Sequence, residues 1–345
     1  MTPPTTMNAL ILKHDGFAPA REGAAIDMLE PFLAYDALPV PKPGPGQVLI
    51  KVRMASVNPS DLYFIKGEYG QPRVKGQPAG FEGVGDVVGG QGLYARWLKG
   101  KRVAFVGGAN GSGAWAEYIV APAATCVVVK KGMRDEDAAG HVVNPVTAWA
   151  MFDIVRQSGS KSFVFTAAFS QLGKLMAGLA RDNGYGMIAV IRKQSQAQHL
   201  TELGAKHVLL STDPDFAERL ADLCKTEKPR ILLDAVASQQ AADIFMAMPN
   251  RARWIIYGRL ATEAPSISEP GQFIFLDKKI EGFWLMKWFK QTSTIGKMRT
   301  LRAVQDRFIK GDWKTEVVAT VRLADAMEQL PAALRLGDGK VMIVP

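Results

Sequence analysis

Short apolar runs alternate with amphipathic helical patterns over residues 162–257, and this alternation constrains the fold more than any other feature of the chain. The runs Ser162–Thr166 and Met187–Ile191 have the length of buried strands, and the segment between them, Gln171–Asn183, has helical periodicity. Further strands are expected at residues 207–210, 230–233 and 253–257. Strands and helices in this order form a parallel sheet with helices on both faces. We therefore predict an α/β, doubly wound domain of the Rossmann type.

The residues outside this region have a different pattern, typical of a β-rich domain. Residues 48–54 alternate as a strand, residues 102–106 do the same, and residues 317–345 return to strand and short helix. Between the two regions, residues 292–310 have the pattern of a basic amphipathic helix. We predict a β-rich domain over residues 1–134, an inserted Rossmann domain over residues 135–290, and a segment over residues 291–345 that rejoins the first domain.

Composition excludes several classes of protein. The chain has 345 residues and is 48% hydrophobic, enough for about two domains with sizeable cores. Its two cysteines, Cys126 and Cys224, cannot form a disulfide framework, and we expect a cytoplasmic protein. We see no secretory signal in Met1–Leu12 and no apolar run near the roughly 20 residues that span a bilayer, so no membrane partner is expected. The net charge of +9 comes from scattered side chains, which makes nucleic acid an unlikely partner.

The loop after the first Rossmann strand is a candidate dinucleotide site. In such sites a tight, small-residue loop brings the pyrophosphate to the N-terminus of the next helix. Here the loop is Ala167–Gly173, in which Gly173 is the only glycine and Ser170 can donate to a phosphate. The alternative interpretation is an ordinary turn between a strand and a helix.

The end of the second Rossmann strand indicates which dinucleotide binds. NAD-binding folds usually place Asp or Glu there, to hold the ribose 2′-hydroxyl. This chain has Arg192 and Lys193, and a guanidinium can pair with a 2′-phosphate in two-point fashion. We therefore predict NADPH, with a surface Arg-Lys pair as the alternative.

Five motifs then combine into the likeness of one family. They are Asn58–Asp61, Gly67–Gly70, Gly80–Gly85, Val143–Ala148 and Glu281–Leu285. Together they resemble the zinc-independent medium-chain dehydrogenases/reductases, most of all the mitochondrial-type 2-enoyl thioester reductases, with quinone oxidoreductases next. The resemblance covers nearly the whole chain and implies a Rossmann domain inserted into a GroES-like catalytic domain.

The same resemblance implies a site without metal. Zinc-dependent members use Cys and His to hold the ion that polarises the substrate oxygen. Asn58 stands where the first of these cysteines would be, and Phe81 stands where the histidine would be. The chain's four histidines have no ligand spacing, so no metal site is predicted.

By similarity, Tyr69 is the catalytic residue. Hydride addition to the β-carbon of a conjugated acceptor leaves an enolate, which needs a hydrogen-bond donor at oxygen and a proton at the α-carbon. A phenol, with an ordinary pKa of about 10, is neutral at pH 7 and can donate. The alternative is that Tyr69 only completes the turn Gly67–Gly70.

Other positions match cofactor-binding residues of the family. In the order of the chain, they correspond to residues on the nicotinamide side of the cofactor, the loop at the pyrophosphate and the segment at the 2′-phosphate. A turn that contacts the nucleotide, a segment that lies along the nicotinamide and a lysine near the C-terminus follow. The residues are Asn144, Thr147, Phe169, Ser170, Gln171, Leu172, Gly173, Arg192, Lys193, Gln194, Tyr257, Gly258, Arg259, Leu260, Phe283, Trp284, Leu285, Met286 and Lys340. Phe169 and Gln171 are bulkier than the family's usual small residues.

Three functions follow from these observations. The first is an NADPH-dependent reductase of conjugated carbonyl compounds such as 2-enoyl thioesters, and the second is an NADPH:quinone oxidoreductase. The third is a non-catalytic binder of nucleotide or RNA, like the zeta-crystallins.

We also expect a homodimer joined through the Rossmann domains, with Phe273–Leu276 and the strand near Ile280 at a sheet edge.

Overall fold

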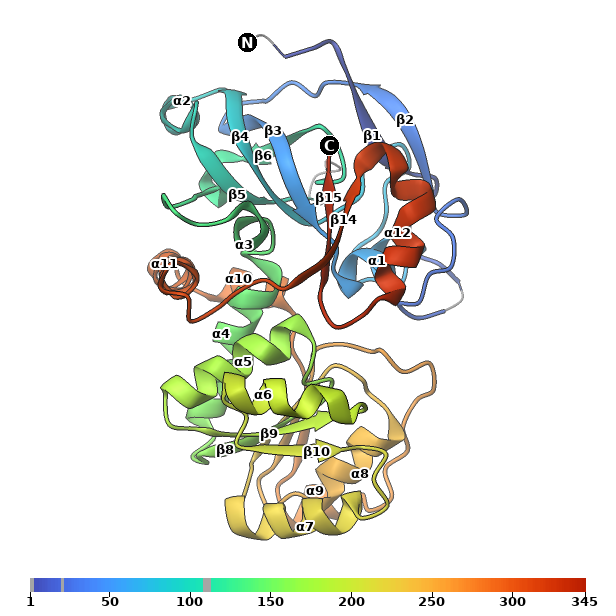
Figure 1. The fold of residues 1–345 in the computed structure, drawn as a ribbon, viewed down its shortest axis with the longest axis vertical. Helices are drawn as coiled ribbons and strands as arrows, with labels where there is room; N and C mark the ends of the chain where they lie inside the picture. The colour runs from blue at the N-terminus through green and yellow to red at the C-terminus, as the bar shows by residue number, and fades with distance from the viewer. Residues whose placement is uncertain (1–2, 20–21, 108–112) are drawn as a thin grey trace. The chain divides into compact units, whose positions relative to one another are not determined.

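The structure, a computed structural model, describes residues 3–19, 22–107 and 113–345. It divides into two compact units (Figure 1). Unit 1 comprises Met1–Val143 and Leu301–Pro345, and unit 2 comprises Asn144–Thr300. The divisions expected after residues 134 and 290 precede these by nine and ten residues (143 against 134, 300 against 290).

Unit 1 is built on a seven-stranded sheet in the order β14-β15-β3-β4-β5-β7, with β6 paired to β3. A separate pair of antiparallel strands, β1 and β2, completes its β structure. The strands are β1 (Thr6–Leu12), β2 (Leu33–Pro39), β3 (Gln47–Ser56), β4 (Glu82–Gly90), β5 (Arg102–Val106), β6 (Tyr118–Pro122), β7 (Val127–Val128), β14 (Val317–Arg322) and β15 (Lys340–Val344). The helices are α1 (Pro59–Lys66), α2 (Leu93–Leu98), α3 (Asp135–Ala139), α12 (Ala326–Arg335) and two short 3₁₀ turns, η1 (Ala123–Thr125) and η3 (Leu323–Asp325).

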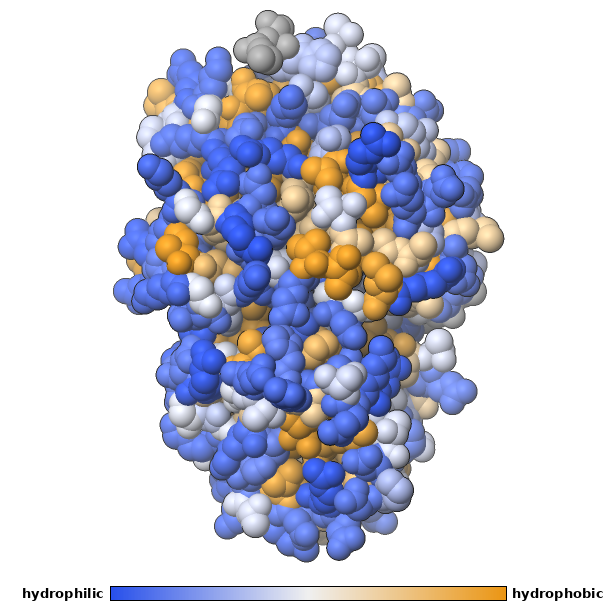
Figure 2. All heavy atoms as spheres, in the orientation of Figure 1, coloured by the Kyte–Doolittle hydropathy of each residue, from blue (hydrophilic) through white to orange (hydrophobic). Residues whose placement is uncertain are grey.

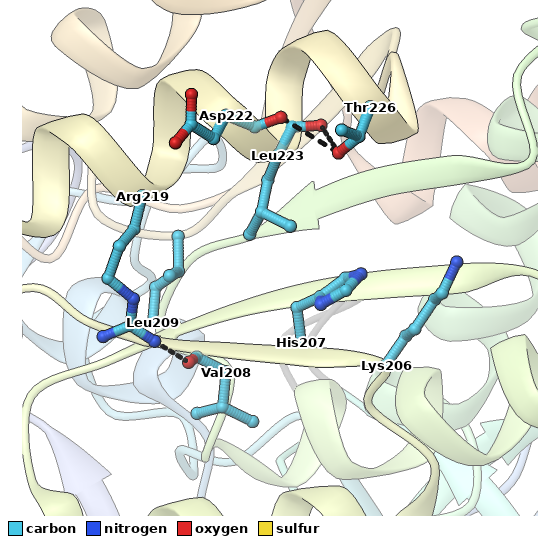
Figure 3. A pocket seen from close by; sticks show the side chains of 8 residues that line it. All are labelled: Lys206, His207, Val208, Leu209, Arg219, Asp222, Leu223 and Thr226. Atoms are coloured by element: carbon cyan, nitrogen blue, oxygen red, sulfur yellow. Dashed lines mark hydrogen bonds between the residues drawn. The ribbon is translucent and has the colours of Figure 1, made fainter.

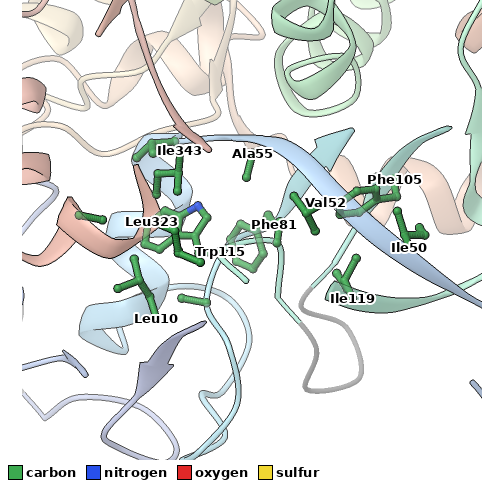
Figure 4. Close-up of a cluster of buried hydrophobic side chains, with 14 of the residues drawn as sticks. Leu10, Ile50, Val52, Ala55, Phe81, Phe105, Trp115, Ile119, Leu323 and Ile343 are labelled. Carbon is green, nitrogen blue, oxygen red and sulfur yellow. The ribbon is translucent and has the colours of Figure 1, made fainter. Parts of the chain in front are cut away.

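The core of unit 1 joins residues from both ends of the chain. Trp115 and Phe105 are fully buried, and Leu10 from β1 and Ile343 from β15 lie in the same cluster (Figure 4). Because β15 pairs with β3, the C-terminal segment is part of unit 1.

Unit 2 contains a six-stranded sheet in the order β10-β9-β8-β11-β12-β13, in which every neighbouring pair is parallel. Its strands are β8 (Ser162–Phe165), β9 (Gly186–Ile191), β10 (His207–Leu210), β11 (Ile231–Asp234), β12 (Arg253–Ile256) and β13 (Lys279–Gly282). Its helices are α4 (Val143–Gln157), α5 (Gln171–Asp182), η2 (Gln194–Gln196), α6 (Ala197–Leu203), α7 (Phe216–Glu227), α8 (Gln239–Ala247), α9 (Gly271–Phe275) and α10 (Leu285–Gln291), and α11 (Thr294–Lys310) runs on into unit 1.

The predicted fold class is confirmed. Helices α5 and α6 lie on one side of the parallel sheet and α7 and α8 on the other (Figure 1). The strand order changes direction between β8 and β11, which is the position where doubly wound sheets bind their ligands. At the edge expected for Phe273–Leu276 and Ile280, the edge strand is β13, and residues 273–275 are helical, in α9.

Candidate active site

Most of the predicted cofactor residues of unit 2 lie at one edge of its sheet. Residues 169–173 follow β8, residues 192–194 follow β9, residues 257–260 follow β12 and residues 283–286 follow β13. Because all of these strands are parallel, their carboxyl ends share an edge, and segments far apart in the sequence are brought together there.

The loop after β8 is tight and ends in a capped helix. The Ser170 hydroxyl accepts a hydrogen bond from the Gly173 N–H at 3.2 Å, which caps α5. A Cβ at position 173 would overlap the carbonyl oxygen of Ala168, so only glycine allows this approach. The free N–H groups of a helix N-terminus attract anions, and this loop therefore has the form of a phosphate site.

A buried lysine brings positive charge to the same loop. Lys174 is almost fully buried in the first turn of α5, and its Nζ lies 4.0 Å from the centre of the Phe169 ring. The His199 ring meets Phe169 edge-on at 5.8 Å. A cation at a helix N-terminus opposes the helix dipole, and this one adds positive charge beside the loop. Sequence reasoning missed Lys174 because it considered only the small residues of the loop.

Arg192, the residue predicted to bind a 2′-phosphate, lies at the carboxyl end of β9. It follows the last residue of β9 and is exposed, as are Lys193 and Gln194. Within the described ranges, the structure shows no ion pair for the Arg192 guanidinium, so that group is available to a ligand.

A buried carboxylate, also missed in the sequence, fixes the carboxyl ends of three strands. Asp234 accepts hydrogen bonds from the Thr166 hydroxyl at 2.5 Å, from the Trp254 indole N–H at 2.9 Å and from two backbone N–H groups. These contacts join β8, β11 and β12 at the candidate site. Nearby, burial raises the pKa of Tyr257 well above its usual value. Its hydroxyl is a buried polar atom without a hydrogen-bond partner among the described residues, which is consistent with a missing ligand.

Two predicted residues lie on α4 and four lie after β13. Asn144 is half-buried and Thr147 is buried one turn later on the same helix. The Phe283 N–H donates to the Ile256 carbonyl at 2.9 Å, which ties the segment 283–286 to the end of β12.

In unit 1, Tyr69 lies in the turn after α1 with its ring against Phe81. The two ring centres are 5.1 Å apart, and Phe64 packs against Phe81 at 4.9 Å. Tyr69 is half-buried, so one part of it packs on the core and another part reaches solvent. Phe81, which the sequence analysis expected in place of a zinc-ligating histidine, thus supports the tyrosine ring.

A buried arginine holds this turn in place. Arg73 donates to the carbonyl oxygens of Gly16 at 3.1 Å, Ile65 at 3.2 Å and Asp15 at 3.4 Å. Gly67 has a φ of 80°, and a Cβ there would lie 2.5 Å from the Arg73 guanidinium carbon. Glycine at position 67 is therefore required both by the backbone conformation and by the close approach of Arg73.

Elsewhere in unit 1, the polar side chains of Ser56, Asn58, Glu82 and Lys340 form a buried network. The Asn58 amide donates to Ser56 Oγ at 3.1 Å and to Glu82 Oε1 at 2.9 Å, and its oxygen accepts from Lys340 Nζ at 2.5 Å. Lys340 also donates to the Val57 carbonyl at 2.8 Å, and burial lowers its pKa. The sequence placed Lys340 beside the cofactor, and the structure shows it inside this network.

Asp61 connects the network to Phe81. Its carboxylate accepts from the N–H groups of Asn58 at 2.8 Å and Phe81 at 2.7 Å. Burial raises the pKa of Asp61 to about 7. The Asp61 carboxyl group therefore holds the backbone at Asn58 and at Phe81, the residue on which the Tyr69 ring packs.

The position of Lys340 is relevant to whether this site could bind a metal ion. The Lys340 Nζ donates at 2.5 Å to the Oδ1 of Asn58, the residue expected from the sequence at the position of the first zinc-ligating cysteine. In residues 3–19, 22–107 and 113–345, no group of three His, Cys, Asp or Glu side chains is arranged to hold a metal ion.

One shallow cavity lies away from these residues. It has a volume of about 430 Å³ and is lined by residues of β10 and α7, including Lys206, His207 and Arg219 (Figure 3). Glu227 pairs with Lys206 at 2.6 Å and with His207 at 2.8 Å, and these hydrogen bonds lower the pKa of Glu227 to about 2. The Lys206 charge is thus already paired, and none of the predicted site residues lines this cavity.

Known proteins match the whole chain. Residues 44–131 match the alcohol dehydrogenase GroES-like domain, and residues 172–300 match the domain described as zinc-binding dehydrogenase. The crystal structure of a proposed NADPH:quinone reductase from Mesorhizobium loti is 52% identical, covers 100% of both chains and superposes with a TM-score of 0.96. The chain belongs to the medium-chain dehydrogenase/reductase family.

Within that family, the relatives define a branch. The mitochondrial enoyl-[acyl-carrier-protein] reductase of Bos taurus is 29% identical over 84% of this chain and 78% of its own length. The corresponding enzyme of Dictyostelium discoideum is 28% identical over 86% and 85%. The chain lies in the branch of quinone oxidoreductases and enoyl reductases, as its motifs predicted, and the branch consists of oxidoreductases. Of the helices in the described residues, none is both long and apolar enough to cross a membrane.

Proposed function

We propose that this protein is an NADPH-dependent reductase of conjugated carbonyl compounds, such as 2-enoyl thioesters or related enones. The observation that carries the proposal is Tyr69, which Arg73 and Phe81 hold in a fixed turn. The enoyl reductases among the relatives support the same substrate class.

The residues of unit 2 fit NADPH. The capped N-terminus of α5, the Lys174 ammonium and the small residues around Gly173 suit a pyrophosphate. Arg192 suits a 2′-phosphate. When bound, NADPH supplies the hydride that adds to the β-carbon of the acceptor.

Tyr69 has the complementary task in this proposal. Negative charge develops on the substrate carbonyl oxygen during reduction, and a neutral phenol can donate a hydrogen bond to it. The same hydroxyl can deliver the proton that the α-carbon requires. Phe81 and Arg73 keep the ring in place, so that little energy is spent on orienting the donor.

The experiment that tests the proposal is NADPH oxidation against crotonyl-CoA, a longer enoyl-CoA, a benzoquinone and a naphthoquinone. We expect an enoyl-CoA to be reduced with the highest kcat/KM. If only the quinones are reduced, the second function, an NADPH:quinone oxidoreductase, replaces the first. That alternative is favoured by the description of the 52% identical relative. If no compound is reduced and NADPH still binds, the protein is a non-catalytic binder.

We further propose a cytoplasmic enzyme that requires no zinc. Both cysteines are buried thiols, which suits a reducing compartment. The Lys340 ammonium at Asn58 disfavours a divalent cation at the position of the family's zinc site. About one zinc per chain in purified protein, with activity lost to a chelator, would contradict this.

A homodimer joined through β13 completes the proposal. β13 is an edge strand, Ile280 on it is 41% exposed, and Ile274 and Phe275 beside it are 76% and 82% exposed. An apolar sheet edge without a cover promotes association. Light scattering at micromolar concentration should give twice the chain mass, and Ile280→Lys should shift it towards one chain. A native protein that remains monomeric would rule this interface out.

A further inference from the structure

The short helix α2 presents an apolar surface that the fold does not use. Ala95 and Leu98 are buried and attach the helix to unit 1. Three large side chains face outwards instead: Leu93 is 83% exposed, Trp97 is 55% exposed and Tyr94 is 48% exposed. Isolated exposed apolar residues are common, but three on one six-residue helix form a contiguous apolar patch, which is typical of an interaction site.

The charge around this patch has one sign. The sequence contains no Asp or Glu between Asp86 and Glu117, whereas Arg96, Lys99 and Lys101 lie on α2 or directly after it. Among the described residues, none of these three cations forms an ion pair with a carboxylate. The patch is therefore complementary to a surface that is both anionic and apolar.

The arrangement of the rings narrows the class of partner. Tyr94 and Trp97 stack on each other with their centres 5.4 Å apart, and Lys101 Nζ lies 3.2 Å from the centre of the Trp97 ring. A nucleic-acid base would have to displace Lys101 before it could stack there. Leu93, the most exposed of the three, has no stacking face at all. By contrast, Trp, Tyr and a flanking Lys are the residues that lie at the boundary between lipid headgroups and acyl chains.

The position of α2 permits such a contact. The helix lies at a corner of unit 1, at the end of β4 and away from α1 and α12 (Figure 1). In the same corner, Figure 2 shows hydrophobic residues among hydrophilic ones. A peripheral contact there needs no membrane-spanning segment, so it is consistent with the lack of a spanning helix in the described residues.

We propose that α2 is a docking surface for phospholipid bilayers with anionic headgroups. Leu93 and Trp97 enter the interfacial region, while Arg96, Lys99 and Lys101 contact the headgroups. This inference is independent of the proposed reduction, because α2 contains none of the residues assigned to it. It goes beyond the expectation of no membrane partner, which considered only segments that span a bilayer.

The test is flotation of the full-length protein with vesicles. Vesicles of phosphatidylcholine with about a third phosphatidylserine should bind at least about tenfold more protein than vesicles of pure phosphatidylcholine. Raising the salt concentration should weaken the binding, because part of it is electrostatic. The double variant Leu93→Ser/Trp97→Ser and the variant Lys99→Glu should each lose at least about tenfold in binding.

A matched control distinguishes binding through the α2 patch from non-specific binding of any exposed apolar residue. Leu336→Ser removes another exposed apolar residue of unit 1, one that is 60% exposed at the end of α12, and it should bind vesicles like the native protein. NADPH oxidation without vesicles should be the same in all variants. Equal binding to both vesicle types, or no effect of the α2 variants, would overturn the proposal. A native protein that binds no vesicles would also overturn it. In that case, α2 variants that lose single-stranded RNA binding would indicate a nucleic-acid surface, and α2 variants with a changed oligomeric state would indicate a contact between copies of the chain.

Discussion

Replacing Arg73 should lower the stability of the protein and displace the Tyr69 turn, although Arg73 belongs to none of the sequence motifs. The side chain is buried and donates to three backbone carbonyl oxygens, two of them at 3.1 and 3.2 Å. A hydrogen bond from a charged group contributes about 1.5–3 kcal/mol, so losing the two shorter ones costs about 3–6 kcal/mol. The buried Ile65 carbonyl would also lose this donor, whereas the Gly16 carbonyl would keep its hydrogen bond from the backbone N–H of residue 73 at 3.1 Å.

The assay for Arg73→Met combines thermal unfolding with kinetics. At roughly 2–4 °C per kcal/mol, Tm should fall by roughly 6 °C or more. In the protein that remains folded, kcat should fall by about tenfold or more, because the tyrosine is no longer held in place. The Kd of NADPH should stay unchanged, since Arg73 lies in unit 1 and the cofactor residues at the sheet edge lie in unit 2.

Two further variants make the result interpretable. Arg73→Lys retains a buried cation with fewer donors, and it should recover part of both losses. Arg335→Met removes an exposed arginine whose one ion pair, with Asp27, is at 3.0 Å, and it should change stability by less than about 1 kcal/mol. If Arg73→Met keeps the native Tm and kcat, Arg73 does not position the turn.

Three other predictions concern the cofactor and pH. Arg192→Ala should weaken NADPH binding by about 1.5–3 kcal/mol in calorimetry and leave NADH binding unchanged; equal affinity of the native protein for both cofactors would refute the role of Arg192. Gly173→Ala should raise the Kd of NADPH by at least about tenfold, because the added Cβ overlaps the Ala168 carbonyl and moves the loop; an unchanged Kd would show that the loop binds no phosphate. The pKa of Asp61, about 7, is raised by burial, so the stability it contributes is complete below the unfolded pKa and is lost as pH rises through 7. Denaturant titrations should show this loss in the native protein and not in Asp61→Asn, and identical pH profiles would contradict it.

The sequence was informative where local patterns decide the structure. The apolar runs at 162–166 and 187–191 became β8 and β9, because a buried parallel strand requires a short continuous apolar segment. Since loops at the carboxyl ends of such strands share an edge, the positions of Ser170, Arg192 and Tyr257 could also be anticipated. The edge of the sheet was less predictable, because the apolar run at 273–275 suits a short helix as well as a strand.

The sequence was uninformative where a contact joins distant residues. Lys340 reaches Asn58 across 282 positions, and Asp234 reaches Thr166 across 68. Neither pair has a spacing that a local pattern could reveal. Arg73 was missed for a related reason: a lone arginine ordinarily indicates solvent, and only the fold shows that it is buried against Gly67.

The central claim is that the Tyr69 hydroxyl takes part in reduction, and Tyr69→Phe tests it most directly. The substitution keeps the ring on Phe81 and removes only the oxygen. General acid–base groups contribute about 10²–10⁴ in rate, so enoyl-CoA reduction should fall by at least about a hundredfold while the Kd of NADPH stays the same. Quinone reduction should fall less, because a quinone oxygen can take its proton from water. A Tyr69→Phe enzyme that reduces every substrate of the native protein at the native rate would contradict the account.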